Sequence, residues 1–207
     1  MSKQSKQVDK SKYKFRSYCG ADRWASYWHQ LDEVLALSPK TILEIGVGDG
    51  VFKNYIKNNT DIEYKNLDIA EDLNPDIIGS VENINLPDNS VDLVCAFEIL
   101  EHLPFDKFEK CLTEIRRVSK SDVVISLPHF GHTIKFSFKI PFLKEKKISF
   151  KIPHHPKHKF NGQHYWEIGK KGYSSSKIRK IISKYFKIRK NFIPFNNQYH
   201  YFYILEK

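Results

Sequence analysis

Length and composition narrow the classes of protein to which this chain could belong. It has 207 residues, 41% of them hydrophobic, and 34 Lys and Arg against 24 Asp and Glu give a formal net charge of +10. This length suits one α/β domain with a modest insertion. The polar first residues predict no signal peptide, and no apolar run reaches the roughly 18 residues of a membrane span. Three scattered cysteines without a Cys-x-x-Cys pair argue against a disulfide framework, so we expect a cytoplasmic protein.

The charge is unevenly distributed along the chain. Residues 1–30 carry seven Lys and Arg against two Asp and Glu, a net charge of +5. Residues 31–120 carry nine basic against eighteen acidic residues, a net charge of −9, and residues 121–207 carry eighteen against four, a net charge of +14. The three net charges sum to +10. A basic face attracts nucleic acid, anionic lipid headgroups or a phosphorylated substrate. A lysine-rich solvated surface is the plain alternative, and the sequence leaves both interpretations open.

The first 37 residues are predicted to form a basic arm and a helix. Residues 1–18 are polar and lysine-rich, which predicts a flexible arm. Apolar residues recur at three-to-four spacing over residues 22–37, which predicts an amphipathic helix that ends before Ser38 and Pro39. We therefore expect an N-terminal extension over residues 1–37 and a domain over residues 38–207.

The segment 41–50, TILEIGVGDG, is the most informative part of the sequence. Its first half is a continuous apolar run typical of a buried parallel strand. After Glu44, glycine occupies every second position, at Gly46, Gly48 and Gly50, which predicts a turn whose backbone approaches a ligand closely. The alternate spacing fits neither the dinucleotide fingerprint nor a P-loop, and a plain tight turn is the structural alternative.

The remaining elements are predicted in an alternating order. Strands are expected at 62–67, 76–78, 91–97 and 122–127, with helices at 50–58 and 105–118. A helix at 174–186 and a closing hairpin of strands at 187–195 and 198–205 complete the chain. The alternation of strands and helices predicts a doubly wound, mostly parallel α/β sheet.

Three motifs in this order resemble one known family. The pattern Glu-x-Gly-x-Gly-x-Gly resembles motif I of the class I S-adenosylmethionine-dependent methyltransferases. An acidic residue, Asp68, ends the next strand about 20 residues later, where it could accept hydrogen bonds from two ribose hydroxyls. The segments LPDNS, VDLVCAF and EILEHL resemble the small-molecule branch of the same family. The resemblance implies a seven-stranded, Rossmann-like sheet with an antiparallel last strand and S-adenosylmethionine as cofactor.

The resemblance also implies which residues bind the cofactor. The acidic residue and the glycine turn would hold its amino-acid end, namely Glu44, Gly46, Gly48 and Gly50. The ribose and adenine would lie against Asp68, Ile69, Ser80 and Val81, although many relatives carry Asp at the position of Ser80. The last residue of the fourth strand and the residue after it would lie under the cofactor, namely Phe97 and Glu98.

The function implied is methyl transfer to an oxygen or nitrogen of a small or lipid-linked acceptor. An RNA-directed methyltransferase, or a non-catalytic basic nucleic-acid-binding protein that keeps the fold, is the alternative. No RNA-binding signature is present, and the intact glycine motif with Asp68 argues against loss of cofactor binding.

An insertion after the fifth strand, residues 128–171, is expected to set the substrate specificity. Apolar and basic residues alternate over 134–140 and again over 148–152, which predicts a β-hairpin with one apolar and one basic face. Three interpretations stay open for the apolar face: packing on the domain, a lid over an apolar substrate, or a flap that touches a membrane surface.

Histidines and carboxylates suggest two candidates for the chemistry. His129 directly follows the fifth strand, where a neutral imidazole could act as general base, although a loop histidine that shapes the pocket is an equal alternative. Glu98, Glu101 and His102 form Glu-x-x-Glu-His, predicted on one face of a helix start. This pattern binds a divalent metal in some methyltransferases and orients a loop in many others, so the metal question stays open.

Overall fold

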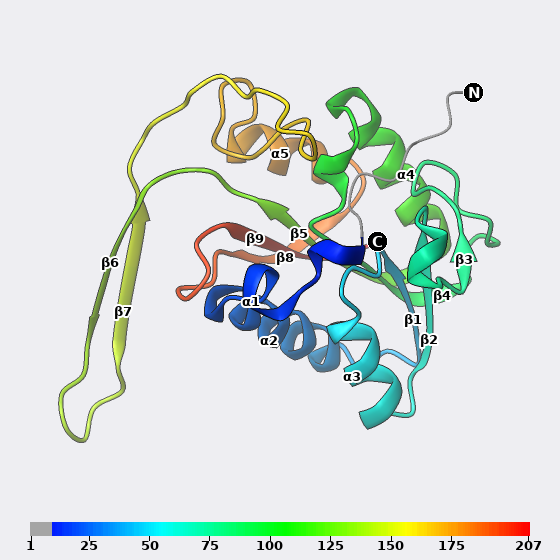
Figure 1. Cartoon of the computed structure of the whole chain (residues 1–207), viewed down its shortest axis with the longest axis horizontal. Helices are drawn as coiled ribbons and strands as arrows, with labels where there is room; N and C mark the ends of the chain where they lie inside the picture. Colours follow the sequence, from blue (N-terminus) through cyan, green and yellow to red (C-terminus); the bar gives the residue numbers. More distant parts are fainter. Residues whose placement is uncertain (1–9) are drawn as a thin grey trace.

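The computed structural model describes residues 10–207 and contains one central seven-stranded sheet (Figure 1). The strand order is β3-β2-β1-β4-β5-β9-β8; neighbours from β3 to β5 are parallel, and β9 runs antiparallel to both β5 and β8. The strands are β1 (Thr41–Ile45), β2 (Glu63–Asp68), β3 (Ile77–Ile78), β4 (Val91–Phe97), β5 (Ser119–Pro128), β8 (Lys187–Phe192) and β9 (His200–Glu206). The predicted doubly wound α/β fold with its antiparallel closing strand is confirmed.

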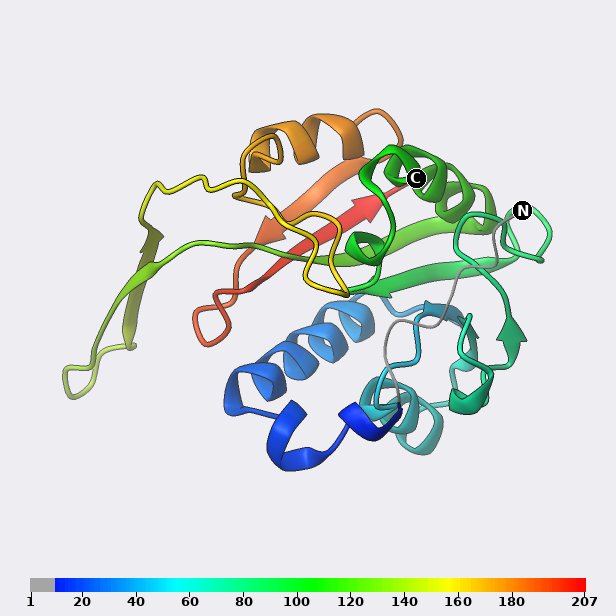
Figure 2. The same cartoon turned by 45° about the horizontal axis from the view of Figure 1, so that its top comes forward.

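Helices cover both faces of this sheet (Figure 2). On one face lie α2 (Ala21–Ala36) and α3 (Val51–Asn59), and on the other lie α4 (Phe108–Val118) and α5 (Ser175–Ile182). Side chains alternate across β1, so Leu43 and Ile45 join the core under α4 and α5 while Ile42 joins the core under α2 and α3. Burial on both faces explains the continuous apolar run of this strand.

The order of the strands creates a crevice at one edge of the sheet. Strand β1 pairs with β2 on one side and with β4 on the other, so successive crossovers leave it in opposite directions. Ligands of open α/β sheets bind at such a switch point, outside the carboxyl ends of the strands. In this chain those ends carry the glycine turn after β1, Asp68 after β2 and Glu98 after β4.

Two predicted helices differ from the observed ones. The segment EILEHL does not start an α-helix; it forms the short 3-10 helix η3 (Leu100–His102), and α4 begins at Phe108 after η4 (Phe105–Lys107). The segment is too short for an α-helix because Pro104 follows it closely. Helix α5 ends at Ile182, four residues before the predicted end. Its start agrees with the prediction, since the Ser174 side chain accepts a hydrogen bond from the backbone of Lys177 at 3.2 Å.

The predicted basic arm is folded over the described part of its length. Residues 1–9 lie outside the described residues, but η1 (Lys10–Lys12) and α1 (Phe15–Tyr18) follow at once. Tyr13 and Tyr18 pack edge to face with ring centroids 4.8 Å apart, and the Arg23 guanidinium lies 4.0 Å from the centre of the Tyr18 ring. Residues 10–18 are therefore a folded segment against α2, and the prediction of a flexible arm is wrong for them.

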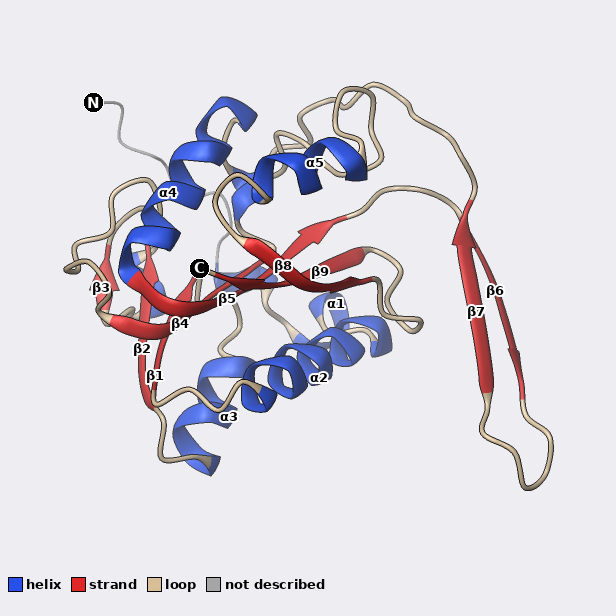
Figure 3. Ribbon diagram, turned by 180° about the vertical axis from the view of Figure 1, so that it is seen from behind, coloured by secondary structure: helices blue, strands red, loops and turns tan. Residues whose placement is uncertain are grey.

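The insertion forms the predicted hairpin and then returns to the body of the protein. Strands β6 (Thr133–Phe138) and β7 (Lys146–Lys151) pair antiparallel as a separate two-stranded sheet that projects from the molecule (Figure 3). The apolar face of this hairpin is exposed, so the interpretation that it packs on the domain is wrong. Among residues 10–207, no helix is long and apolar enough to cross a bilayer.

Trp166 anchors the returning part of the insertion. It is fully buried, with its ring 5.1 Å from that of Phe105 and 5.0 Å from that of Phe108, and its Nε1 donates to the Leu103 carbonyl oxygen at 3.2 Å. Large buried rings contribute both apolar area and specific ring contacts. This contact fixes the insertion against η4 and α4.

We expect Trp166→Ala to lower the free energy of unfolding by about 3–5 kcal/mol, because it removes a buried ring and leaves a cavity. Denaturant unfolding followed by circular dichroism measures this change. The neighbouring Tyr165→Ala is the control, since Tyr165 is 38% exposed and should cost much less. Equal losses in the two variants would contradict an anchoring role for Trp166.

Candidate functional site

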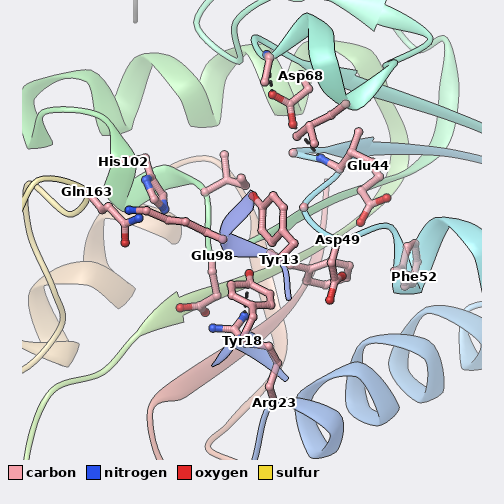
Figure 4. Close-up of a pocket in the computed structure, with 18 of the residues that line it drawn as sticks. Tyr13, Tyr18, Arg23, Glu44, Asp49, Phe52, Asp68, Glu98, His102 and Gln163 are labelled. Carbon is pink, nitrogen blue, oxygen red and sulfur yellow. Dashed lines mark hydrogen bonds between the residues drawn. The ribbon is translucent and has the colours of Figure 1, made fainter. Parts of the chain in front are cut away.

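A cavity of about 510 Å3 lies at the switch point of the sheet (Figure 4). Its walls come from the carboxyl ends of β1, β2 and β4, from the folded N-terminal segment, and from two loops that end at residues 163–164 and 199–200. Most of the cofactor residues predicted from the sequence line it: Glu44, Gly46, Gly48, Asp68, Ile69, Phe97 and Glu98. The remaining predicted residues do not, namely Gly50, Ser80, Val81 and His129.

The glycine turn owes its shape to the positive φ angles of its three glycines. Gly46, Gly48 and Gly50 have φ of 81°, 55° and 76°, which side chains adopt only with strain. A Cβ at Gly46 would lie 2.0 Å from Cδ1 of Ile99, whereas a Cβ at Gly48 would meet no protein atom within 4 Å. Gly46 therefore allows close packing of the chain on itself, and Gly48 leaves backbone open toward the cavity.

Asp68 holds the glycine turn against the end of β2. Its Oδ2 accepts a hydrogen bond from the backbone of Val47 at 2.9 Å, and its Oδ1 accepts one from the backbone of Ala70 at 2.8 Å. A carboxylate has about four acceptor positions, so both oxygens keep capacity for further donors. Ile69 and Leu73 line the cavity beside it. This end of the cavity combines acceptors for hydroxyl groups with an apolar wall.

Glu44 is buried below the same turn. It is 4% exposed, and the Tyr64 hydroxyl donates a hydrogen bond to its Oε2. Burial raises the pKa of Glu44 to about 8, although the Tyr64 hydrogen bond opposes this rise. A cation bound in the cavity would favour the charged form of this carboxyl.

The N-terminal segment contributes residues that the sequence did not predict for the site. Tyr13, Tyr18, Arg23 and Tyr27 line the cavity, together with Asp49 of the glycine turn. Arg23 Nη1 donates to the Tyr18 hydroxyl at 3.0 Å, and the Tyr27 hydroxyl donates to Asp49 Oδ2 at 2.6 Å. These contacts bring a guanidinium and a carboxylate to the same mouth of the cavity. Nothing local in the polar first residues signals this role.

Glu98 and His200 form the floor at the other end. Glu98 has φ of 53°, a strained angle for a residue with a side chain, and its Oε2 lies 3.6 Å from His200 Nε2. Burial raises the pKa of Glu98 to about 8 and lowers that of His200 to about 3. Both groups are therefore held close to their neutral forms. Strain of this kind is typical of functional positions.

A second group of ligand-type side chains adjoins this end. Glu101, His102 and His164 bring a carboxylate oxygen and two imidazole nitrogens within 4.8 Å of one another. His102 and His164 line the cavity, and Glu101 is fully buried behind them. The sequence predicted Glu98, Glu101 and His102 as the trio, but His164 from the insertion takes the place of Glu98 in the group that the structure assembles.

The geometry of this cluster suits a divalent cation. Nε2 of His102 and Nε2 of His164 lie 4.0 and 3.8 Å from Glu101 Oε1, too far for hydrogen bonds. Both oxygens of Glu101 are buried without a hydrogen-bond partner, which is costly for a carboxylate. Two ligand bonds of about 2.1 Å at a tetrahedral angle separate their donor atoms by roughly 3.4 Å, so the two distances from Glu101 exceed those of a bound cation by only about half an ångström.

A third carboxylate orients one of these imidazoles. Glu167 Oε1 lies 3.0 Å from His164 Nδ1 and accepts a hydrogen bond from the Tyr199 hydroxyl at 2.9 Å. Burial alone would raise the pKa of Glu167, but the hydrogen bonds from His164 and Tyr199 outweigh it and lower the pKa. The contact directs Nε2 of His164 toward Glu101. A carboxylate behind a histidine is a common support for metal ligands.

His129 does not reach the main cavity. It lines a separate hollow of about 380 Å3 at the base of the hairpin, where its ring stacks on Tyr201 with centroids 5.4 Å apart. Burial lowers the pKa of His129 to about 3, and its Nδ1 has no hydrogen-bond partner. The predicted general base therefore lies outside the cavity that the other predicted residues line, because β5 ends beside β9 and directs this side chain toward it.

The two residues predicted at the adenine edge also lie elsewhere. Val81 is 4% exposed and belongs to the core under α4, while the Ser80 hydroxyl accepts from the backbone of Glu82 at 3.2 Å in a local turn. Gly50 is the N-cap residue of α3. These three positions shape the surrounding turns without lining the cavity.

Comparisons with known proteins agree with this fold and site. Residues 43–127 match the family model described as a methyltransferase domain. The chain is similar to the N-methyltransferase NodS of Bradyrhizobium japonicum in complex with S-adenosyl-L-homocysteine, at 8% identity over 97% of this chain and 94% of that one, with a TM-score of 0.63. No curated protein matches the chain.

Two further structures are similar over most of the chain. A 1,6-didemethyltoxoflavin-N1-methyltransferase of Burkholderia thailandensis shares 14% identity over 91% of this chain and 78% of that one, with a TM-score of 0.60. The magnesium protoporphyrin IX methyltransferase of Synechocystis was solved with bound S-adenosylmethionine. It shares 12% sequence identity over 98% of this chain and 86% of that one, with a TM-score of 0.59. These likenesses establish the Rossmann-like methyltransferase fold. Residues 43–127 thus match a methyltransferase domain, and the chain as a whole has the fold of the class I S-adenosylmethionine-dependent methyltransferases.

The raised pKa of Glu44 predicts how stability depends on pH without ligand. The pKa is about 8 in the folded protein against an ordinary 4.5, so the folded state keeps a proton that the unfolded chain loses between these values. Stability therefore falls as pH rises through this window, by up to about 1.4 kcal/mol per pH unit for this group. Glu44→Gln keeps an acceptor for Tyr64 and should flatten the slope.

Urea unfolding from pH 5 to pH 8 measures this effect. The control Glu63→Gln alters an exposed carboxyl of the neighbouring strand β2 and should leave the slope as it is. A Glu44→Gln variant with an unchanged slope would show that this carboxyl holds no extra proton in the folded state.

Proposed function

We propose that this methyltransferase transfers the methyl group of S-adenosylmethionine to an oxygen atom of a small-molecule acceptor. One observation carries the proposal: the same cavity has two chemically different ends. The end at Asp68 suits a nucleoside, and the end beside Glu101, His102 and His164 suits a hydroxyl group. The neighbouring methyltransferases with small-molecule substrates in their names support a small acceptor.

The charges of the cavity match those of the cofactor. S-adenosylmethionine carries a sulfonium, an ammonium and a carboxylate. Glu44 and Asp49 offer negative charge near the glycine turn, and Arg23 offers a guanidinium that can pair with a carboxylate. Asp68 would accept the ribose hydroxyls, and the adenine would lie against Ile69. These roles are consistent with the open backbone at Gly48.

For methyl transfer, the main task of the protein is to position the acceptor and the cofactor. The sulfonium is already activated, so in-line placement of the acceptor and exclusion of water supply most of the catalysis. Phe97 and Glu98, which both line the cavity, would lie under the sulfonium. Tyr13 and Tyr18 would help to exclude water, because the folded N-terminal segment already lines the cavity.

The acceptor end explains the choice of oxygen. Glu101, His102 and His164 would hold a divalent cation, which when bound lowers the pKa of a neighbouring hydroxyl as a Lewis acid. Burial lowers the pKa of His102 to about 4, so its imidazole is neutral and available as a ligand at pH 7. Burial raises the pKa of Glu101 well above its usual range, which is a cost that a bound cation would offset.

The cofactor assignment predicts binding of S-adenosylhomocysteine to the purified protein. The ligand should raise the melting temperature, since it binds only the folded state, and Asp68→Ala should weaken binding at least tenfold by isothermal titration calorimetry. Asp76→Ala is a matched control, because Asp76 also caps β2 through Asn66 but lies outside the cavity. Wild-type protein that does not bind S-adenosylhomocysteine would favour the non-catalytic nucleic-acid-binding alternative.

The acceptor end predicts cation binding that depends on His164. Titration with Mn2+ at about pH 7.5 should show one site per chain, and His164→Ala should weaken it at least tenfold through loss of one ligand. His132→Ala is the control, since His132 is exposed and belongs to the same insertion. Equal Mn2+ affinity in wild type and His164→Ala would contradict the site without affecting the cofactor assignment.

A further inference from the structure

The β6–β7 hairpin has two chemically distinct faces. Its register pairs Ile134 with Phe150, and Phe136 with Ile148, so these apolar side chains share one face. The opposite face carries the pairs Lys135 with Ser149, Ser137 with Lys147, and Thr133 with Lys151. The hairpin is thus amphipathic, with Lys146 beside Phe138 as the one charged residue among the paired positions of the apolar face.

The apolar face is bare. Of the 18 large hydrophobic side chains that are exposed among the described residues, nine lie within residues 134–152. Phe136, Phe138, Ile148 and Phe150 are each more than 50% exposed. A contiguous apolar surface of this kind marks an interaction site in a folded protein. None of these residues lines the main cavity, so the hairpin does not act as a lid in this structure.

The polar face is the one that contacts the body. The ammonium groups of Lys135 and Lys147 lie 5.4 and 5.7 Å from the centre of the Phe195 ring, in the loop between β8 and β9. Gln198 of the same loop donates to the Ser149 hydroxyl at 3.2 Å. These contacts hold the polar face toward the body, and of the apolar face only Phe150 lines the hollow at the base of the hairpin. Figures 1 and 3 show the hairpin extending outward from the sheet.

The tip displays its most apolar residues. Leu143 donates its backbone N–H to the Ile140 carbonyl at 3.1 Å, which closes a tight turn over residues 140–143. Phe142 at this turn has φ of 67° and is fully exposed, and Leu143 is 58% exposed. A bulky aromatic residue in the left-handed region is strained, and in this conformation the ring is left in solvent.

Charge identifies the kind of partner. Residues 133–151 contain six lysines and one acidic residue, Glu145. Apolar side chains with lysines around them match the interface of a membrane that contains anionic lipids, where lysine stems lie along the apolar region and their ammonium groups meet the headgroups. We propose that the hairpin docks on an anionic phospholipid membrane, with Phe142 and Leu143 inserted into the headgroup and acyl boundary.

Two other partners fit this surface less well. Single-stranded nucleic acid binds aromatic platforms with arginine nearby, but the hairpin contains no arginine and about half of its exposed apolar residues are Ile or Leu. A second copy of the chain would bring two sets of six lysines together, which is unfavourable. The proposal rests on the hairpin alone and does not depend on methyl transfer.

Vesicle co-sedimentation tests the proposal with the full chain. We expect binding to vesicles that contain phosphatidylglycerol, much weaker binding to pure phosphatidylcholine, and loss of binding as salt rises from about 0.1 M to about 1 M. The double variant Phe142→Asn, Leu143→Asn should bind at least about tenfold more weakly, because it removes both inserted side chains. Asparagine tolerates a positive φ, so this variant should fold. Lys144→Gln with Lys146→Gln should weaken binding about fivefold per lysine.

Trp28→Gln is the matched control, since Trp28 is 59% exposed on α2 and should leave vesicle binding unchanged. The proposal would be overturned if the wild-type protein did not bind anionic vesicles. It would also be overturned if the Phe142→Asn, Leu143→Asn variant bound them as tightly as the wild type does. Retention on immobilised DNA that the variant does not alter, without vesicle binding, would assign the charge to nucleic acid. A wild-type dimer that the variant converts to a monomer, again without vesicle binding, would assign the face to a second copy.

Discussion

The two hydrogen bonds of the Asp68 carboxylate are the constraint on which the site depends. They tie the backbone of Val47, in the glycine turn, to the end of β2, and so fix the turn relative to the sheet. With the turn fixed, Gly46 has a positive φ and lies against Ile99, which together favour glycine, and the backbone at Gly48 lines the cavity. The same carboxylate is left with free acceptor positions at the cavity wall. One side chain thus organises the turn and offers a polar group to a ligand.

The acceptor end is built differently, because it brings together buried ionisable side chains from distant parts of the chain. Glu98 and Glu101 follow β4, Glu167 comes from the insertion, and His200 begins β9. Taking several carboxylates out of water is unfavourable unless partners compensate them, and the two oxygens of Glu101 have no hydrogen-bond partner. Such a cluster does not stabilise the fold, and its concentration at one end of the cavity is what a functional site requires.

The sequence predicted the parts of the molecule that local patterns determine. The strands of the sheet follow from apolar runs, and the glycine turn with Asp68 follows from spacing, because both signals lie within about 30 residues. The sequence did not predict Arg23 as a site residue, nor His164 as a partner of Glu101 and His102, since both take these places only through tertiary packing. His129 was misplaced for the same reason: its position after β5 was correct, but the neighbouring β9 decides where its side chain points.

On the proposed function, one end of the cavity binds the nucleoside of the cofactor and the other end binds the hydroxyl acceptor, while the proposed membrane contact lies on the hairpin outside the cavity. The most direct test is a crystal structure of the chain with S-adenosylhomocysteine. The account predicts ribose hydroxyls on Asp68, the methionine carboxylate near Arg23 and the sulfur directed toward His102 and His164. A cofactor that lies outside this cavity, or that points its sulfur away from these histidines, would contradict it.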